Sequence, residues 1–470
     1  MGKDVESMII RSIDAIIRML DADYIENSDI EEKIKGVCID SRKVQEGNLY
    51  IPIHGANNNG HDYVKQAIEN GAKAVLWERK EANPPKDVVV ILVEDTTKAL
   101  QQLARVYRKQ LHMKVVGITG SNGKTSTKDI LAAVLKTTYR TQKTLGNFNN
   151  EIGVPLTLLS LDEDCEAAVV EMGMENLKEL SFLTEMVRPD IAIISNVGTA
   201  HLENLGTMEN IARAKLEIVE GLKEQGVFIY NGDQALLRDA VVEKQILGSI
   251  HIKTFGMDER NDYVISSVIQ KREGIKFRIN DSTPSYQLDM IGKHQAMNAT
   301  AAYLAAKALF VSDENIRKGF LEIEKTGLRN ELVDFGDCLI LNDSYKSNPQ
   351  SALAALDTME EFDYDYKVAV LGDMLELGDT SDMIHYTLGK DLKNYHLNEV
   401  YTIGDMARYI CQGAWNNLSD VKIKHVQDKE ELLTYLRPFE HKKAMMLIKG
   451  SRGMKLDEVV DALVKKVEEE

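Results

Sequence analysis

Cysteine is scarce in this sequence, with four residues in a chain of 470. Cys38, Cys165, Cys338 and Cys411 lie far apart, and no two of them have C-x-x-C spacing. Small domains held together by disulfides are dense in cysteine, so the sequence excludes a disulfide scaffold. A reducing cytoplasm is therefore the expected compartment.

Long hydrophobic runs are also missing. The segment 8–20 has the apolar periodicity of a helix, but charged residues interrupt it at Arg11, Asp14 and Arg18. It therefore matches neither the apolar core of a signal peptide nor a membrane span. No other segment is apolar for long enough, so we expect no membrane span.

Clustered positive charge is the third absence. Lys and Arg number 57 against 74 Asp and Glu, which gives a net charge of −17. Binding to a nucleic-acid backbone depends on clustered Lys and Arg, so nucleic acid is not an expected partner. A convincing G-x-G-x-x-G after a strand is absent as well, which argues against a dinucleotide-binding oxidoreductase.

The length and composition are those of a multidomain globular protein. At about 150 residues per domain, 470 residues predict roughly three domains. Residues 1–112 mix short strands and helices and predict a small α/β domain. Residues 113–327 and 328–470 each alternate continuous apolar runs with helical patterns, which is typical of mostly parallel sheets buried on both faces. We therefore predict an α/β protein of three domains, with a central P-loop-type domain and a Rossmann-like C-terminal domain.

Eight apolar runs carry this prediction. Those of the central domain lie at 113–119, 167–170, 190–195 and 226–230. Those of the C-terminal domain lie at 339–343, 368–373, 400–405 and 445–450. Gly, Asp or Asn ends each of the C-terminal runs, at the edge where α/β sheets bind ligands.

A glycine loop directly follows the first central strand. The segment 119–125 reads T-G-S-N-G-K-T, and a helical pattern continues to Leu135. Glycines allow backbone N–H groups to turn toward phosphate oxygens, a lysine adds mobile charge, and a hydroxyl can bind Mg²⁺. The strict pattern has glycine at position 118, where this chain has Ile. A lone glycine turn is often only a tight connection, but this combination predicts a site for ATP and Mg²⁺, formed by Gly120, Ser121, Asn122, Gly123, Lys124, Thr125 and Ser126.

Two more polar residues follow central strands. Glu171 ends the strand at 167–170, and His201 comes after the strand at 190–195. A carboxylate in this place can hold Mg²⁺, whereas histidine is a less expected ligand for a hard cation. A solvated glutamate and a hydrogen-bonded histidine are the alternatives that chemistry alone leaves open.

The order of the motifs along nearly the whole chain resembles the Mur ligase family. Besides the glycine loop, the resemblance depends on Gly146–Pro155, V-E-M-G-M around Glu171, Asn196–Glu203, Ala214–Ile218, Gly292–Ala299, Asn342–Tyr345 and Lys449–Arg452. It implies an ATP-dependent amide ligase that joins D-alanyl-D-alanine to UDP-N-acetylmuramoyl-tripeptide through an acyl phosphate, in peptidoglycan precursor synthesis. We expect a cytoplasmic monomer. The third residue of the tripeptide, meso-diaminopimelate or lysine, stays open.

The resemblance also implies residue roles. Lys124 would hold the β- and γ-phosphates, Thr125 one Mg²⁺, and Glu171 with His201 a second one. Lys215 matches a lysine that carries a carbamate in several family members; a surface lysine paired with Glu217 or a neighbouring acid is the alternative. The nucleotide would meet Asn298 at adenine, Arg329 at the domain junction and Asp343 at the ribose.

The implied substrate residues come with two departures from the family pattern. Ser41 and Arg42 would lie near the UDP moiety, and Asn150 and Tyr345 are further candidates. Lys346 stands where members that add D-alanyl-D-alanine usually have Asn, and Asn59 stands where Asp is common. Lys346 is therefore a candidate catalytic residue and also a reason to consider a family member with another amine acceptor. A regulatory protein that hydrolyses ATP without ligation is the second alternative.

Overall fold

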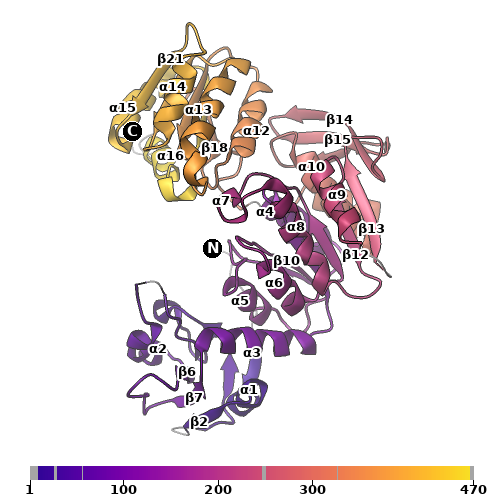
Figure 1. Ribbon diagram of the computed structural model, residues 1–470, viewed down its shortest axis with the longest axis vertical. Coiled ribbons are helices and arrows are strands. Elements are labelled where there is room, and N and C mark those ends of the chain that lie inside the picture. Colours follow the sequence, from indigo (N-terminus) through magenta and orange to yellow (C-terminus); the bar gives the residue numbers. More distant parts are fainter. Residues whose placement is uncertain (1–8, 26–28, 56, 246–249, 325, 466–470) are drawn as a thin grey trace.

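The computed structural model describes residues 9–465 apart from 26–28, 56, 246–249 and 325. Three domains follow one another along the long axis of the molecule, in chain order (Figure 1). This confirms the predicted three-domain α/β fold, while the positions where one domain ends and the next begins stay predictions. No helix within the described residues is long and apolar enough to cross a membrane.

The N-terminal domain contains a five-stranded sheet and a small two-stranded one. The larger sheet has the order β2 (Asp23–Ile25), β7 (Val89–Val93), β6 (Ala74–Glu78), β5 (Leu49–Tyr50), β4 (Val37–Cys38). The expected helix over 8–20 is shorter in the structure. Ile10–Ser12 form strand β1, which pairs with β3 (Lys33–Lys35), and α1 (Ile13–Leu20) begins only where the Ser12 side chain accepts a hydrogen bond from the Ala15 N–H. Residue 8 lies outside the described residues.

The central domain is built on a nine-stranded sheet, and all four predicted strands are present. They are β8 (Lys114–Thr119), β10 (Ala167–Glu171), β11 (Ile191–Ile194) and β12 (Val227–Asn231). These strands are parallel, as continuous apolar runs predicted. The remaining strands of the sheet are β9 (Thr141–Lys143), β13 (His251–Gly256), β14 (Tyr263–Lys271), β15 (Gly274–Ile279) and β16 (Tyr286–Leu288).

Helices cover both faces of this sheet. Alternate residues such as Val115 and Val116 belong to different cores because neighbouring side chains on a strand point to opposite faces. One face packs against α4 (Lys124–Lys136), α10 (Gln295–Ala308) and α11 (Asp313–Gly319). The other packs against α5 (Gly153–Leu159), α6 (Glu179–Val187), α8 (Met208–Leu216) and α9 (Ala235–Glu243). This second core continues into the N-terminal domain through α3 (Thr96–Gln110), which packs on α5.

The C-terminal domain has a six-stranded sheet that contains the other four predicted strands. Its order is β17 (Glu331–Phe335), β18 (Cys338–Asp343), β22 (Ala444–Lys449), β19 (Lys367–Gly372), β20 (Glu399–Ile403), β21 (Lys422–Val426), with only β17 antiparallel. One face packs against α12 (Pro349–Glu360), α13 (Ser381–Asp391) and α14 (Ala407–Trp415), and the other against α15 (Lys429–Leu436) and α16 (Asp457–Val464). In Figure 1 this domain lies next to α7 (Leu202–Leu205) of the central domain.

Candidate active site

A cavity of about 1040 Å³ lies between the central and C-terminal domains. Most of the predicted site residues line it: Ser121, Asn122, Gly123, Lys124, Thr125, Ser126, Asn150, Glu171, His201, Asn298, Arg329, Asp343, Tyr345 and Lys346. Gly120, Lys215, Ser41 and Arg42 are not among the described residues that line it. The fold therefore brings together residues that are more than 200 positions apart in the chain.

The glycine loop has a fixed shape that requires its glycines. Gly120 has φ +153°, and a Cβ atom there would lie 1.9 Å from Ser195 Oγ. Gly123 has φ +78°, and a Cβ atom there would lie 2.4 Å from Asn298 Oδ1. The departure at position 118 has a structural reason: Ile118 is a fully buried residue of β8, paired with Glu171 and Ile193 on the neighbouring strands. The strand simply extends to Thr119 before the loop begins.

Lys124 begins helix α4 and folds back over the loop. Its Nζ donates to the Gly120 carbonyl at 2.6 Å. Burial, with a contribution from the nearby charge of Lys346, lowers the pKa of Lys124 to about 8. An anion in the cavity would favour the charged form, so this lysine is suited to phosphate binding.

Thr125 and Glu171 place two side chains with oxygen atoms that can bind a metal ion at the end of the sheet. Thr125 Oγ1 donates to Glu171 Oε2 at 2.9 Å, and Asn149 Nδ2 donates to Glu171 Oε1 at the same distance. The Glu171 side chain is 3 % exposed. Mg²⁺ prefers oxygen ligands such as carboxylates and hydroxyls, so Thr125 and Glu171 fit that ion.

His201 precedes the short helix α7 and has a left-handed backbone, with φ +64°. Its Nδ1 is 3.7 Å from Glu376 Oε2. Burial, followed by the positive charges of Lys346, Lys124 and Lys215, lowers the pKa of His201 to about 3. The imidazole is therefore neutral near pH 7, as a nitrogen ligand of a metal must be.

Lys215 lies on α8 and is only 1 % exposed. The alternative of a surface lysine paired with Glu217 is therefore wrong. The Glu217 carboxylate instead accepts hydrogen bonds from the backbone N–H groups of Lys178 and Ser181. No acidic side chain within the described residues forms an ion pair with Lys215, whose charged neighbours are the cations Lys124 and Lys346. Burial and the charges of Lys124 and Lys346 place the pKa of Lys215 well below its usual value.

Arg329 reaches across the cavity from the segment that joins the two domains. Its guanidinium lies 3.8 Å from the centre of the Tyr345 ring, and Nη2 donates to Thr125 Oγ1 at 3.2 Å. Nη1 is buried and has no hydrogen-bond partner among the described residues. A buried cationic donor without an acceptor is a costly arrangement that an anion would relieve.

Asn298 and Asp343 lie on opposite domains. Asn298 on α10 accepts a hydrogen bond from Thr127 Oγ1 at 3.3 Å and donates to Gln295 Oε1 at 2.7 Å. Asp343 ends β18, and its Oδ2 lies 2.5 Å from the buried Nζ of Lys449.

The four candidate substrate residues fall into two groups. Asn150 and Tyr345 line the cavity, where Asn150 Oδ1 accepts the Gly153 N–H at 2.8 Å at the start of α5. Ser41 and Arg42 lie in the N-terminal domain, where Ser41 Oγ donates to Gln66 Oε1 at 2.7 Å and Arg42 pairs with Asp40 at 2.8 Å. The structure does not bring this second group to the cavity.

The structure adds site residues that the sequence did not single out. Lys449 and Asn149 fall within the motifs on which the family resemblance depends, so the sequence contained a signal that could have identified them. Glu376, which faces both His201 and Lys346, lies in no motif and is found only through the fold. Asn348 Nδ2 donates to Asn122 Oδ1 at 2.8 Å and so links the two domains beside the glycine loop.

Together these features define a three-domain α/β protein with a phosphate-loop-like turn at a domain junction. Three domain families match the chain: the catalytic domain of the Mur ligase family over residues 33–108, the Mur ligase middle domain over 118–306 and the glutamate ligase domain of Mur ligases over 328–452. The chain belongs to the Mur ligase family.

Relatives of known name are similar over almost their whole length. UDP-N-acetylmuramoyl-tripeptide–D-alanyl-D-alanine ligase of Bacillus subtilis is 42% identical over 459 residues, which cover 97% of this chain and 99% of that protein. The ligase of the same name from Escherichia coli is 32% identical, with 92% and 94% covered.

Solved structures of ligases named MurF are similar to this chain over almost their whole length. A crystal structure of MurF from Acinetobacter baumannii has a TM-score of 0.88 at 29% identity and covers 98% of this chain and 100% of that chain. MurF ligase of Thermotoga maritima in complex with ADP has a TM-score of 0.79 at 29% identity, with 92% and 98% covered.

Proposed function

We propose that this protein is an ATP-dependent ligase that joins D-alanyl-D-alanine to UDP-N-acetylmuramoyl-tripeptide. The observation that carries the proposal is the cavity in which one domain contributes the glycine loop and Glu171 and the other contributes Asp343 and Tyr345. The relatives and structures named above support the substrates. Four free thiols support a cytoplasmic location, and we propose a monomer.

The reaction needs two displacements. The tripeptide carboxylate forms a bond to the γ-phosphorus of ATP as ADP leaves, which gives an acyl phosphate. The amino nitrogen of the dipeptide then forms the amide bond to the carbonyl carbon as phosphate leaves, and the nitrogen loses a proton. Phosphorylation is necessary because a free carboxylate is a poor electrophile.

Side chains of the cavity are suited to the first displacement. Lys124 and Arg329 would neutralise charge on the phosphates, and the backbone N–H groups of the loop would hold them. Thr125, Glu171 and His201 would hold Mg²⁺, which when bound adds further charge neutralisation at the transferring group. Asn298 and Asp343 would contact the adenine and the ribose from their two domains.

Lys215 is proposed to carry a carbamate. Carbamate formation joins the neutral amine nitrogen to the carbon of CO₂ with loss of one proton, and the burial of Lys215 favours the neutral amine. We expect Lys215→Ala to lower kcat by about 100-fold, a loss typical of removing a group that stabilises charge in the reaction. Lys223→Ala is the matched control because Lys223 is a partly exposed lysine paired with Asp190.

Mass spectrometry of the intact protein provides a second readout for Lys215. The wild-type chain should carry the added mass of CO₂, and Lys215→Ala should not. Full activity of Lys215→Ala together with an unmodified wild-type chain would remove Lys215 from the mechanism.

Phosphate release, with the product mass confirmed, tests the whole proposal. The purified protein is given ATP, UDP-N-acetylmuramoyl-tripeptide with either diaminopimelate or lysine, and D-alanyl-D-alanine. Release should require all three substrates and should yield the pentapeptide product. Release of phosphate that no muramyl peptide changes would instead favour the regulatory ATPase.

Lys346 justifies testing other acceptors in the same assay. Its ammonium lies in the cavity, 3.5 Å from Glu376 Oε2. If another dipeptide or an amino acid is used better than D-alanyl-D-alanine, and Lys346→Asn restores D-alanyl-D-alanine, the chain is a family member with a different acceptor.

A further inference from the structure

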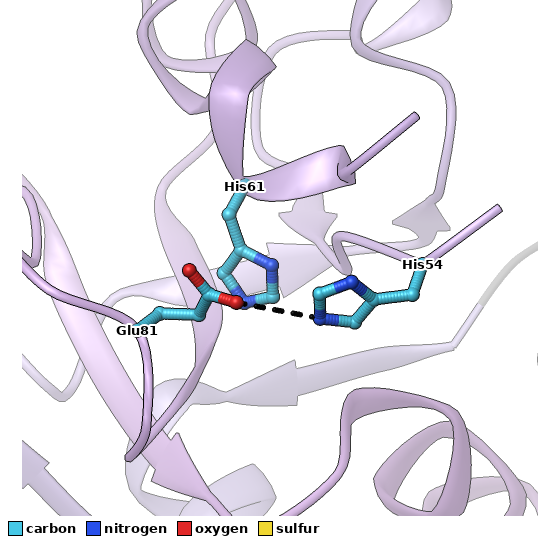
Figure 2. A group of neighbouring side chains, drawn as sticks. All are labelled: His54, His61 and Glu81. Carbon is cyan, nitrogen blue, oxygen red and sulfur yellow. Dashed lines mark ion pairs between the residues drawn. The ribbon is translucent and has the colours of Figure 1, made fainter. Parts of the chain in front are cut away.

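A second cluster of potential ligands lies in the N-terminal domain, away from the cavity. Figure 2 shows the rings of His54 and His61 and the carboxylate of Glu81 pointing toward one another from separate segments. His54 lies between β5 and the short 3₁₀ helix of Gly60–Tyr63, His61 lies in that helix, and Glu81 follows β6. One ligand atom from each lies within 4.8 Å of the other two.

The spacing of the cluster is close to that of a metal site. His54 Nε2 is 3.6 Å from Glu81 Oε1 and 3.0 Å from Glu78 Oε2. Ligand atoms about 2.0–2.1 Å from a tetrahedral zinc ion are about 3.4 Å apart. Small side-chain rotations therefore suffice to bring the ligand atoms of His54, His61 and Glu81, which all lie within 4.8 Å of one another, around one ion.

The hydrogen bonds of His61 leave the correct ring nitrogen facing the cluster. Asn59 Oδ1, which only accepts hydrogen bonds, lies 2.8 Å from His61 Nδ1, so that nitrogen carries the proton. Nε2 then carries the electron pair, which accepts a hydrogen bond of 3.3 Å from the Glu78 N–H that a metal ion would replace. An outer partner that fixes the histidine tautomer in this way is characteristic of metal-binding imidazoles.

We propose that His54, His61 and Glu81 bind a divalent transition-metal ion of the Zn²⁺ type. Two imidazole nitrogens with carboxylate oxygens suit such an ion, whereas Mg²⁺ and Ca²⁺ prefer oxygen alone. The ion connects the segment before Gly60 to the end of β6. The competing arrangement is an ion pair of protonated His54 with Glu78 and Glu81, with Lys80 Nζ 2.8 Å from Glu78 Oε2.

Trp77 offers a local reporter for this site. Its ring centre lies 4.7 Å from that of His61, and its indole N–H donates to the Glu81 carbonyl at 3.1 Å. The chain has two tryptophans, and the other, Trp415, is an exposed residue of the C-terminal domain. The full-length Trp415→Phe protein therefore has Trp77 as its single fluorophore of this type.

The experiment is a titration of that protein with Co²⁺, whose unpaired electrons quench nearby indole emission. Quenching should saturate with one equivalent and should be reversed by Zn²⁺. His54→Gln and Glu81→Gln in the same background should each weaken Co²⁺ binding at least about tenfold. His112→Gln, which changes an exposed histidine outside the cluster, should have no effect.

Two results would overturn the metal site. One is quenching in His54→Gln and Glu81→Gln that matches the parent protein, and the other is no saturable quenching in the parent. His54 and Glu81 are changed rather than His61 because they are more exposed, whereas His61 is buried and packs on Trp77. Equal melting temperatures of parent and variants in chelator establish that the variants fold, and a rise with Zn²⁺ should occur only in the parent and in His112→Gln.

Discussion

Arg329 has a buried donor with no acceptor, and this makes it the most direct single-residue test of anion binding in the cavity. We expect Arg329→Met to lower kcat/KM for ATP by about 10–100-fold, because a hydrogen bond to a charged group contributes about 1.5–3 kcal/mol. The measurement is phosphate release at varied ATP. Arg260→Met is the control, since Arg260 is an exposed arginine paired with Asp258 within the central domain. Equal losses in both variants would contradict the assignment of Arg329.

At the scale of single elements, the side chain of Asn348 caps a helix and also contacts the neighbouring domain. Its side chain accepts the Ser351 N–H at the start of α12, and it also meets Asn122 of the central domain. We expect Asn348→Ala to cost about 1 kcal/mol of stability through the lost cap and, in addition, to raise KM for ATP because the loop loses its partner.

Ser312→Ala separates these two effects. Ser312 caps α11 by accepting the Asn315 N–H, far from the domain junction. The two variants should lose similar stability in thermal unfolding, but only Asn348→Ala should change KM. An unchanged KM in Asn348→Ala would reduce this residue to a helix cap.

Strand β20 begins with the buried carboxylate of Glu399, which makes the stability of the C-terminal domain sensitive to acid. Burial raises the pKa of Glu399, but hydrogen bonds from Lys422, Tyr401 and Tyr366 outweigh burial and lower the pKa below its usual value of 4.5. A carboxylate with a lowered pKa in the folded state stabilises the fold above its unfolded pKa and loses that contribution as the pH falls through the folded value.

We therefore expect the wild-type protein to be more stable than Glu399→Gln near neutral pH and this advantage to shrink as the pH falls below 4.5. Chemical unfolding of both proteins over a pH series measures this difference in stability. Unfolding of the C-terminal domain is monitored with a probe in that domain, such as the fluorescence of Trp415. Glu430→Gln, at the start of α15, is the control. A difference that does not depend on pH would mean that the ion pair with Lys422 is not what stabilises this network.

At the scale of the whole molecule, the cavity draws its residues from two domains, so its geometry depends on how these domains meet. We expect solution X-ray scattering to show a smaller radius of gyration with an ATP analogue and both substrates than with no ligand. Closure excludes water from an acyl phosphate that would otherwise hydrolyse. Asn348→Ala should show less compaction at equal ligand concentration, and an unchanged radius in the wild-type protein would contradict closure.

Much of the fold could be predicted because its signals are local. Continuous apolar runs predicted all eight strands named from the sequence, since a strand buried on both faces needs apolar side chains throughout. The strands β14 to β16 escaped because one face of this antiparallel extension is open, so polar residues interrupt the apolar ones in Tyr263–Lys271 and no continuous apolar run forms. Ile10–Ser12 escaped because its pairing with Lys33–Lys35 is not visible in a helical periodicity.

By itself, the sequence determined the class of the protein and most of the candidate site, because a glycine loop after a buried strand requires particular residues at particular positions. Only the tertiary structure decided that Lys215 is buried without an acidic partner among the described residues, that Glu376 faces His201, and that Ser41 and Arg42 lie apart from the cavity. These facts depend on how separate elements and domains pack, and contacts between distant segments leave no periodic pattern in a single chain.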